Sequence, residues 1–470
     1  MTEAPPAPAT SRPAPPRVTW EPVPFTTDGG EGPLAWGQFH MWHPLLRYGA
    51  AFATLSLRQV ITLPVPGPDV PQALAAVRRL VETHQVLRTR FSDRAGEPWQ
   101  TAAAEGTHLV EVCELGAEAG AGALAAFAER RTRKLAAEPF RHSHEWPVRF
   151  SLVCSGGRVR AVAVVCSHLT FDGWSADLVG TALRRLVAGG RVSPPEWQPL
   201  DQAAYERSER GLRDDARAMR HFRTRLAEVP DAAPRPPHAP ASPPIQQWWL
   251  TSTALAAGSV AVAERTRTSS SAVMLTLAAT ALAALRGQDT VPMLLITGNR
   301  VTERQQRYMA ATAQDGLYVH DGGTGGTLDD AVRAVYRRSA TSYLRASFHP
   351  ASLDALTAEL DGARAHPLDL SGYFNDARLS RDWRLPPGPG PYPRSARGPA
   401  FVRGYDVNDM AFCLVLAQQG ADCQVSLLAD TRLVPAPAIP AVLSGLESVL
   451  CEAATADVPL AAIPPALGIG

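Results

Sequence analysis

The segment AVAVVCSHLTFDGWSADLVG, residues 161–180, contains a histidine that could act as a base. His168 follows an apolar run directly, and Asp172 and Gly173 come four and five residues later. A neutral imidazole can accept a proton from a hydroxyl or amine near pH 7, because its ordinary pKa of about 6.5 lies close to neutrality. The simpler interpretation is a loop histidine followed by an aspartate that caps the next helix. This segment alone leaves both interpretations open.

The flanking residues predict the elements that position this histidine. The stretch RFSLVCSGGRVRAVAVVCS, residues 149–167, contains two apolar runs around a Gly-Gly pair and predicts a β-hairpin. Its second run, residues 159–166, is almost continuously apolar, as expected of a strand covered on both faces. Apolar residues at helical spacing then predict a helix from about Trp174 to Gly189. His168 therefore lies at the C-terminal end of a buried strand.

The whole chain reads as an α/β protein of two lobes. Residues 1–29 are rich in Pro and Ala and predict a disordered tail. The densest proline stretch, residues 230–247, predicts an extended linker between an N-terminal lobe at 30–229 and a C-terminal lobe at 248–465. Each lobe mixes helices with hairpins, so the groove between the lobes is the expected ligand site.

Composition excludes several classes of function. The 470 residues carry a formal net charge of +1, which argues against nucleic acid or an anionic membrane as partner. We expect a cytoplasmic protein, because no stretch is apolar enough to span a bilayer and the six cysteines are scattered. We expect no metal, since the histidines of RHSHEW, residues 141–146, lack a third ligand and fit a polar turn better.

The segment SHLTFDG, residues 167–173, resembles the HHxxxDG signature of condensation domains from nonribosomal peptide synthetases and related acyltransferases. Five further segments resemble motifs of that family, and they occur in the family's order between residues 30 and 455. These are GPLAWGQFHMWH (32–43), THQVLRTRF (83–91), PLDQAAYERSERGL (199–212), LLITGNRVTERQQRYMAATAQDGLYVH (294–320) and YDVNDMAFCLVL (405–416). The second and fifth of the six depart from the usual pattern, which suggests adapted partner surfaces or an unusual acceptor.

The resemblance implies a V-shaped pseudo-dimer of two chloramphenicol-acetyltransferase-like lobes with a tunnel between them. It implies no bound cofactor: the phosphopantetheine arm of an acyl or peptidyl carrier protein delivers the donor thioester. A small-molecule or carrier-bound amine or alcohol would enter from the other side.

The resemblance also implies roles for individual residues. His168 matches the histidine that deprotonates or orients the nucleophile. Asp172 matches a structural aspartate whose partner, across the lobes, would be Arg300. Gly173 would let the backbone approach the substrate, and its N–H could help hold an oxyanion.

Ser167 replaces the first histidine of the signature and is expected to support the loop. A nucleophilic role for Ser167 is the less favoured alternative, because no G-x-S-x-G elbow surrounds it. Six residues are candidates for the tunnel lining: Gln38, Met41, Trp42, Trp174, Tyr373 and Asn375.

We therefore expect a free-standing condensation enzyme that forms an amide or, as second choice, an ester. Two alternatives stay open: an O-acyltransferase that uses acyl-CoA or acyl-carrier donors, and a non-catalytic docking domain. Epimerisation uses a similar signature and also stays open.

Overall fold

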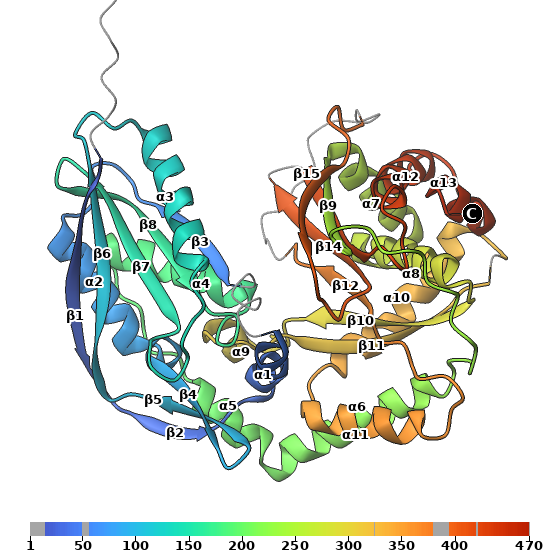
Figure 1. The fold of residues 1–470 in the computed structure, drawn as a ribbon, viewed down its shortest axis with the longest axis horizontal. Coiled ribbons are helices and arrows are strands. Elements are labelled where there is room, and N and C mark those ends of the chain that lie inside the picture. Colours follow the sequence, from blue (N-terminus) through green and yellow to red (C-terminus); the bar gives the residue numbers. More distant parts are fainter. Residues whose placement is uncertain (1–14, 49–55, 324, 379–393, 420–421, 470) are drawn as a thin grey trace, which may run out of the picture. The chain divides into compact units, whose positions relative to one another are not determined.

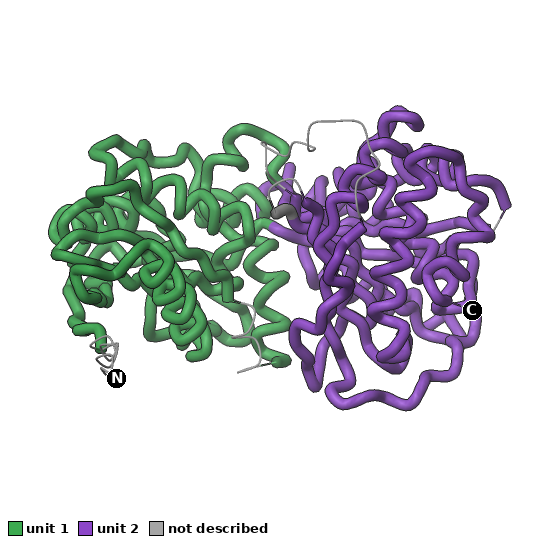
Figure 2. The backbone as a smooth tube through the Cα atoms, turned by 90° about the horizontal axis from the view of Figure 1, so that it is seen from above, with its two compact units in different colours: residues 1–206, 300–312 green, residues 207–299, 313–470 purple. Residues whose placement is uncertain are grey.

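The computed structural model describes residues 15–48, 56–323, 325–378, 394–419 and 422–469 (Figure 1). They divide into two units, which Figure 2 colours separately. Unit 1 comprises residues 1–206 and 300–312, and unit 2 comprises residues 207–299 and 313–470.

The elements of unit 1 are β1 (Arg17–Thr26), β2 (Gly30–Pro33), α1 (Trp36–Tyr48), β3 (Leu57–Thr62), α2 (Val70–Thr83), the 3-10 helix η2 (Gln85–Arg88), β4 (Thr89–Arg94), β5 (Glu97–Ala102), β6 (Glu105–Leu115), α3 (Ala121–Ala136), β7 (Val148–Ser155), β8 (Arg158–Cys166), α4 (Gly173–Val187), α5 (Pro199–Glu206) and α9 (Glu303–Arg307). Its main sheet has the order β1-β6-β7-β8-β3, and a smaller sheet has the order β2-β5-β4. In the main sheet only β6 and β7 pair in parallel.

Strand β8 is buried on both faces, as its apolar run predicts. Val162 and Val164 belong to the core shared with α2 and α4, whereas Ala161 packs with α3 on the other face. This alternation follows from the two-residue period of a strand. The predicted hairpin β7–β8 is confirmed, with Gly156 and Gly157 at positive φ in its turn. The strand that leads to His168 is thereby fixed between two layers of helices.

The elements of unit 2 are α6 (Glu209–Leu226), β9 (Ile245–Ser252), α7 (Thr253–Thr266), α8 (Ser270–Arg286), β10 (Thr290–Thr297), β11 (Gln314–Asp321), α10 (Leu328–Leu344), α11 (Pro350–Asp361), β12 (Gly372–Asp376), β13 (Ala400–Tyr405), β14 (Phe412–Gln419), β15 (Asp422–Asp430), α12 (Ala438–Ala453), η3 (Leu460–Ala462) and α13 (Ile463–Ala466). Its sheet has the order β11-β10-β12-β14-β15-β9-β13. Helices α7, α8, α10 and α12 share one core with this sheet, and α6 and α11 share another. Met293 and Leu294, adjacent on β10, face these two different cores.

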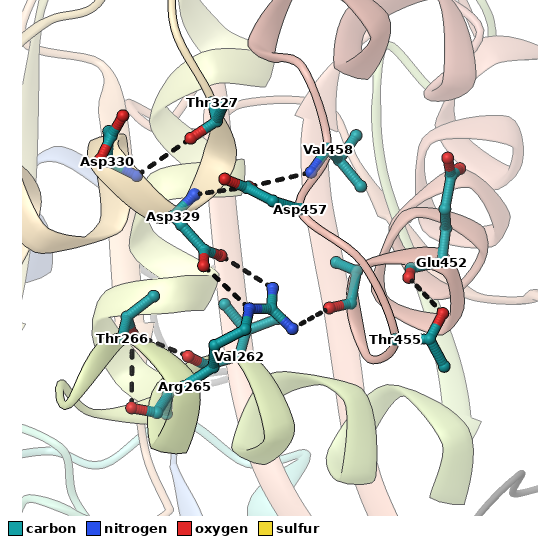
Figure 3. A network of polar contacts seen from close by, with 12 residues as sticks. Val262, Arg265, Thr266, Thr327, Asp329, Asp330, Glu452, Thr455, Asp457 and Val458 are labelled. Carbon is teal, nitrogen blue, oxygen red and sulfur yellow. Dashed lines mark hydrogen bonds and ion pairs between the residues drawn. The ribbon is translucent and has the colours of Figure 1, made fainter.

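A polar network ties three helices of unit 2 together beside that core (Figure 3). Arg265 of α7 forms a bidentate pair with Asp329 of α10, at 2.7 and 2.8 Å, and reaches the carbonyl of Ala453 in α12. The Asp457 carboxylate accepts the amide hydrogens of Asp329 and Val458. These bonds connect segments that are far apart in the sequence.

The predicted domain organisation differs from the structure in three respects. Residues 1–14 of the predicted tail lie outside the described part, but residues 17–26 form β1, which pairs along its length with β6. Unit 1 gives way to unit 2 after residue 206 instead of 229, because α6 packs on β11 of unit 2. The chain also returns to unit 1 between Arg300 and Thr312.

The predicted linker, residues 230–247, lies within unit 2 and does not join the two units. Its last three residues begin β9. The preceding prolines exclude regular structure, as expected, yet side-chain and backbone bonds hold the segment in place. Asp231 accepts two backbone amides, from Ala365 and His366, and Arg235 donates to the carbonyl of Ala284.

No single helix within the described residues is long and apolar enough to cross a membrane. Helices α7 and α8 reach the length and apolar character of a membrane span only when taken together, and the pair is bent by 105°. All six cysteines are free thiols, and five of them are buried.

Candidate active site

The His168 loop is short and anchored on both sides. It begins after β8 and ends where Asp172 caps α4 by accepting the amide hydrogen of Ser175 at 2.8 Å. The helix-capping interpretation of Asp172 is therefore confirmed. Within the loop, Leu169 and Phe171 are fully buried and pack into two different hydrophobic clusters. The amide of Phe171 donates to the carbonyl of Ser167 at 3.0 Å. The backbone around His168 thus has little freedom.

The His168 ring is half-buried, and its Nδ1 is a buried atom without a hydrogen-bond partner in the described part of the chain. Burial lowers the pKa of His168, and the nearby Asp172 charge opposes this only in part. The imidazole is therefore neutral at pH 7 and able to accept a proton.

Asp172 and Arg300 form the predicted ion pair, and it lies entirely within unit 1. One Arg300 nitrogen lies 3.0 Å from each Asp172 oxygen, and both side chains are about 95% buried. Burial alone would raise the pKa of Asp172, but the Arg300 charge and two backbone amides hold it below its ordinary value. The expected placement across two lobes is corrected, because residues 300–312 pack with unit 1.

The Arg300–Thr312 segment is held against the start of α4 by further bonds. Arg300 donates to the carbonyls of Tyr308 and Ala310, both at 2.8 Å. Thr312 donates its hydroxyl to Asp172 at 2.9 Å. Both carboxylate oxygens of Asp172 therefore have hydrogen-bond partners, and no hydrogen bond in the described structure joins Asp172 to His168. Its contacts are those of a structural residue.

Two residues of α4 complete this attachment, and sequence reasoning missed the second. The Trp174 indole donates to the carbonyl of Gln306 at 2.9 Å, so this predicted lining residue serves as an anchor. The Ser175 hydroxyl bonds to both backbone groups of Ala310, at 2.6 and 2.9 Å. The only feature of the sequence that could have indicated this role of Ser175 was its position in the first turn of the helix.

Ser167 forms a contact that the sequence did not predict. Its hydroxyl lies 2.6 Å from Nε2 of His142 and 3.2 Å from the amide nitrogen of Leu169. Burial lowers the pKa of His142 to about 4, so its ring is neutral and can accept the Ser167 proton. Ser167 is 2% exposed. Its hydroxyl is thus occupied in holding the loop, which argues against a nucleophilic role.

His142 belongs to the RHSHEW segment, and residues 142–144 there form the predicted polar turn. It packs edge-on against Phe91 at 6.2 Å between ring centroids, and its carbonyl accepts the Phe91 amide. No motif singles out His142. The only hint in the sequence was the missing first histidine of the signature.

Gly173 is exposed at the first position of α4, and a Cβ added there would meet no protein atom within 4 Å. Its φ lies outside the positive range. Neither backbone conformation nor packing within the described protein therefore requires glycine at this position.

The predicted lining residues fall into different environments. Gln38 is fully buried, and its amide bonds to Ala35 and Gln100, which marks it as a core residue. Trp42 and Met41 belong to the cluster that contains Leu169. Tyr373 and Asn375 lie on β12 of unit 2, outside the unit that holds His168.

The comparisons with known proteins point to the family that the sequence motifs resemble. A model of the condensation-domain family matches residues 62–312, which is just over half of the chain. A probable non-canonical nonribosomal peptide synthetase, CymA of Salinispora arenicola, is 29% identical over 222 residues, which cover 44% of this chain and 3% of CymA. The beauvericin synthetase of Beauveria bassiana is 27% identical over 177 residues, 35% of this chain and 5% of that synthetase. The chain thus spans a small fraction of these relatives.

Solved structures show the same fold. The condensation domain of the monacolin K polyketide synthase MokA has a TM-score of 0.70 at 14% identity and covers 91% of this chain and 98% of that one. SgcC5 from Streptomyces globisporus, in complex with a naphthyl ethanediol and sucrose, has a TM-score of 0.65 at 15% identity and covers 90% and 99%. The predicted α/β fold class is confirmed.

Proposed function

Because the chain belongs to the condensation-domain family, we propose that it transfers an acyl or aminoacyl group from a thioester to an amine or hydroxyl acceptor. The observation that carries this proposal is the neutral, half-buried His168, held on a fixed loop by Asp172 and Arg300. The donor would be delivered on the phosphopantetheine arm of a carrier protein, as the family implies.

His168 acts as the base in this reaction. Its Nδ1 is buried without a partner, which leaves Nε2 to meet the acceptor. Nε2 takes the proton from the acceptor nitrogen or oxygen as that atom attacks the thioester carbonyl. The carbon–sulfur bond then breaks, and the imidazolium returns the proton to the departing thiolate. Amide formation is our first choice. An ester is the second, and the SgcC5 structure with a bound diol supports keeping it.

The test is transfer from acyl-loaded carrier protein to a panel of amines and alcohols, followed by mass spectrometry. His168→Ala should lose product, by a factor of roughly 10²–10⁴ for a general base. His144→Ala is the matched control, because His144 is an exposed histidine of the same unit. Product that appears equally in His168→Ala removes His168 from the mechanism. Carrier binding without product in the wild type would favour a docking domain instead.

The pH dependence provides a second readout. Only neutral His168 can accept a proton, so activity should fall as pH drops through its pKa. Burial lowers that pKa, and the acid limb should therefore lie below about pH 6.5. A limb centred above pH 7 would contradict this assignment.

A further inference from the structure

Unit 2 contains a cavity of about 500 Å³ that none of the candidate site residues lines. Its lining comes from the proline-rich segment after α6, the end of α8, residues 364–369 and the end of β15. It includes Pro292, near the start of β10, whereas the chain continues to Arg300 from the other end of that strand. The cavity therefore lies at the end of the sheet where β10 begins and β15 ends.

The cavity wall is built from several mutually bonded segments. Arg364 donates to the carbonyls of Val229 and Pro230, at 3.1 and 2.6 Å, and so ties two lining segments together. The amide of His238 donates to the carbonyl of Arg432 at 2.9 Å. Five prolines line the space: Pro230, Pro234, Pro237, Pro292 and Pro367. Because proline has few conformations to lose, the site is organised before any ligand enters.

Four arginines line the cavity, and two of them face carboxylates. Arg286 pairs with Asp369 at 2.7 Å, and Arg432 pairs with Asp430 at 2.5 Å. Arg286 is 93% buried, and its Nε has no hydrogen-bond partner in the described residues. Because that nitrogen is itself closed to solvent, an anion in the cavity would meet the charge of Arg286 and not this donor.

The other two arginines, Arg235 and Arg364, donate only to backbone carbonyls in the described structure. The nearby Asp231 does not line the cavity, and its oxygens already accept two backbone amides. The lining has two more guanidinium groups than carboxylates, and the charge of nearby Asp231, which acts on Arg364, reduces this excess to about one. The cavity therefore still attracts an anion such as a phosphomonoester, whose charge is about −1.5 to −2 at pH 7.

The cavity is larger than a phosphate group requires. Val229, Leu368 and Leu433 add apolar surface to the prolines. From this volume and charge we propose that unit 2 binds a small organic phosphomonoester, with the phosphate at the guanidinium groups and the organic body against the apolar wall. The proposal is independent of the function assigned to His168.

Calorimetric titration of the full chain with phenyl phosphate, inorganic phosphate and phenol tests the site. Phenyl phosphate should bind, inorganic phosphate should bind more weakly, and phenol should give no signal at millimolar concentration. Inorganic phosphate binding as tightly as phenyl phosphate would overturn the role of the apolar wall. Phenol binding equally well, or no binding of phenyl phosphate at millimolar concentration, would overturn the anion site.

Variants locate the binding site. Arg364→Gln should weaken phenyl phosphate binding by roughly tenfold, the usual value of a charge-assisted hydrogen bond. Arg235→Gln, at an exposed position, should weaken it by about threefold. If loss of the Arg364 bonds impairs folding, the Arg235→Gln variant still tests the site. Arg337→Gln, on the exposed face of α10, is the control and should change nothing. Unchanged affinity in folded Arg235→Gln, or an equal loss in Arg337→Gln, would overturn the proposal.

Discussion

The two units contain the same local motif with different loops. In unit 1 the hairpin β7–β8 is followed by the His168 loop and α4. In unit 2 the hairpin β14–β15 is followed by residues 431–437 and α12. Each loop has an Asp–Arg pair at one end: Asp172, which ends the first loop, pairs with Arg300, and Asp430, which ends β15 before the second loop, pairs with Arg432.

The two pairs differ in the sequence separation of their partners and in the burial of the arginine. Asp430 takes its arginine from two residues away, and the Arg432 side chain is 56% exposed. Asp172 takes its arginine from 128 residues away, and the Arg300 side chain is 5% exposed. A pair between near neighbours with one partner exposed adds less to a fold. A buried pair between distant segments makes the position of the His168 loop depend on a segment from the other half of the sequence.

The largest change in the free energy of unfolding is expected when the buried pair is broken. Arg300→Met would leave the Asp172 charge buried without its partner, at a cost of about 3–5 kcal/mol. Arg432→Met should cost less, about 1 kcal/mol, because the Arg432 guanidinium lies largely in water and the buried Asp430 keeps the backbone amide of residue 432 as a donor. Urea unfolding of both variants measures the difference.

The double variant Asp172→Asn/Arg300→Met separates charge from packing. It removes the uncompensated carboxylate and should recover part of the loss. Equal destabilisation by Arg300→Met and Arg432→Met would show that the two loops are equivalent and would contradict the comparison.

Much of this arrangement could be predicted from local pattern. The apolar run of β8, the Gly-Gly turn and the Asp172 cap are short-range signals, and all three are present. The order of the family motifs added the pairing of Asp172 with Arg300. Each of these features depends on a few neighbouring residues or on a motif with a known partner.

The division into units could not be predicted in the same way. Proline density near residue 240 indicates irregular backbone, but it does not show that Asp231 and Arg235 would fasten that segment within unit 2. The return of Arg300–Thr312 to unit 1 and the contact of His142 with Ser167 are also long-range. Such contacts leave no periodicity in a single sequence.

An intermediate change in the free energy of unfolding is expected at the first residue of each loop. In both units this residue has a buried hydroxyl group. Ser167 bonds to His142 and Leu169, whereas Thr431 bonds to the carbonyl of Pro244 and the amide of Ala241. Replacing either by alanine leaves buried polar partners unpaired, at about 1–3 kcal/mol in unfolding free energy.

Activity should separate these two variants. Ser167→Ala frees the loop beside His168, so kcat/KM for acyl transfer should fall by at least about tenfold. Thr431→Ala should retain wild-type kcat/KM, since its bonds hold the proline-rich segment of unit 2. Full activity in folded Ser167→Ala would show that the His142 contact does not position His168.

The smallest effect on unfolding is expected at Gly173. Because an added Cβ meets no protein atom within 4 Å and φ is not positive, Gly173→Ala should stabilise the fold by about 0.4–1 kcal/mol. If the backbone here must approach the substrate, the added methyl group would still displace that substrate, and a shift of about 1 Å can cost roughly a hundredfold in rate. A lower kcat/KM at unchanged unfolding free energy would therefore assign Gly173 to substrate contact. Unchanged activity would limit its role to starting α4.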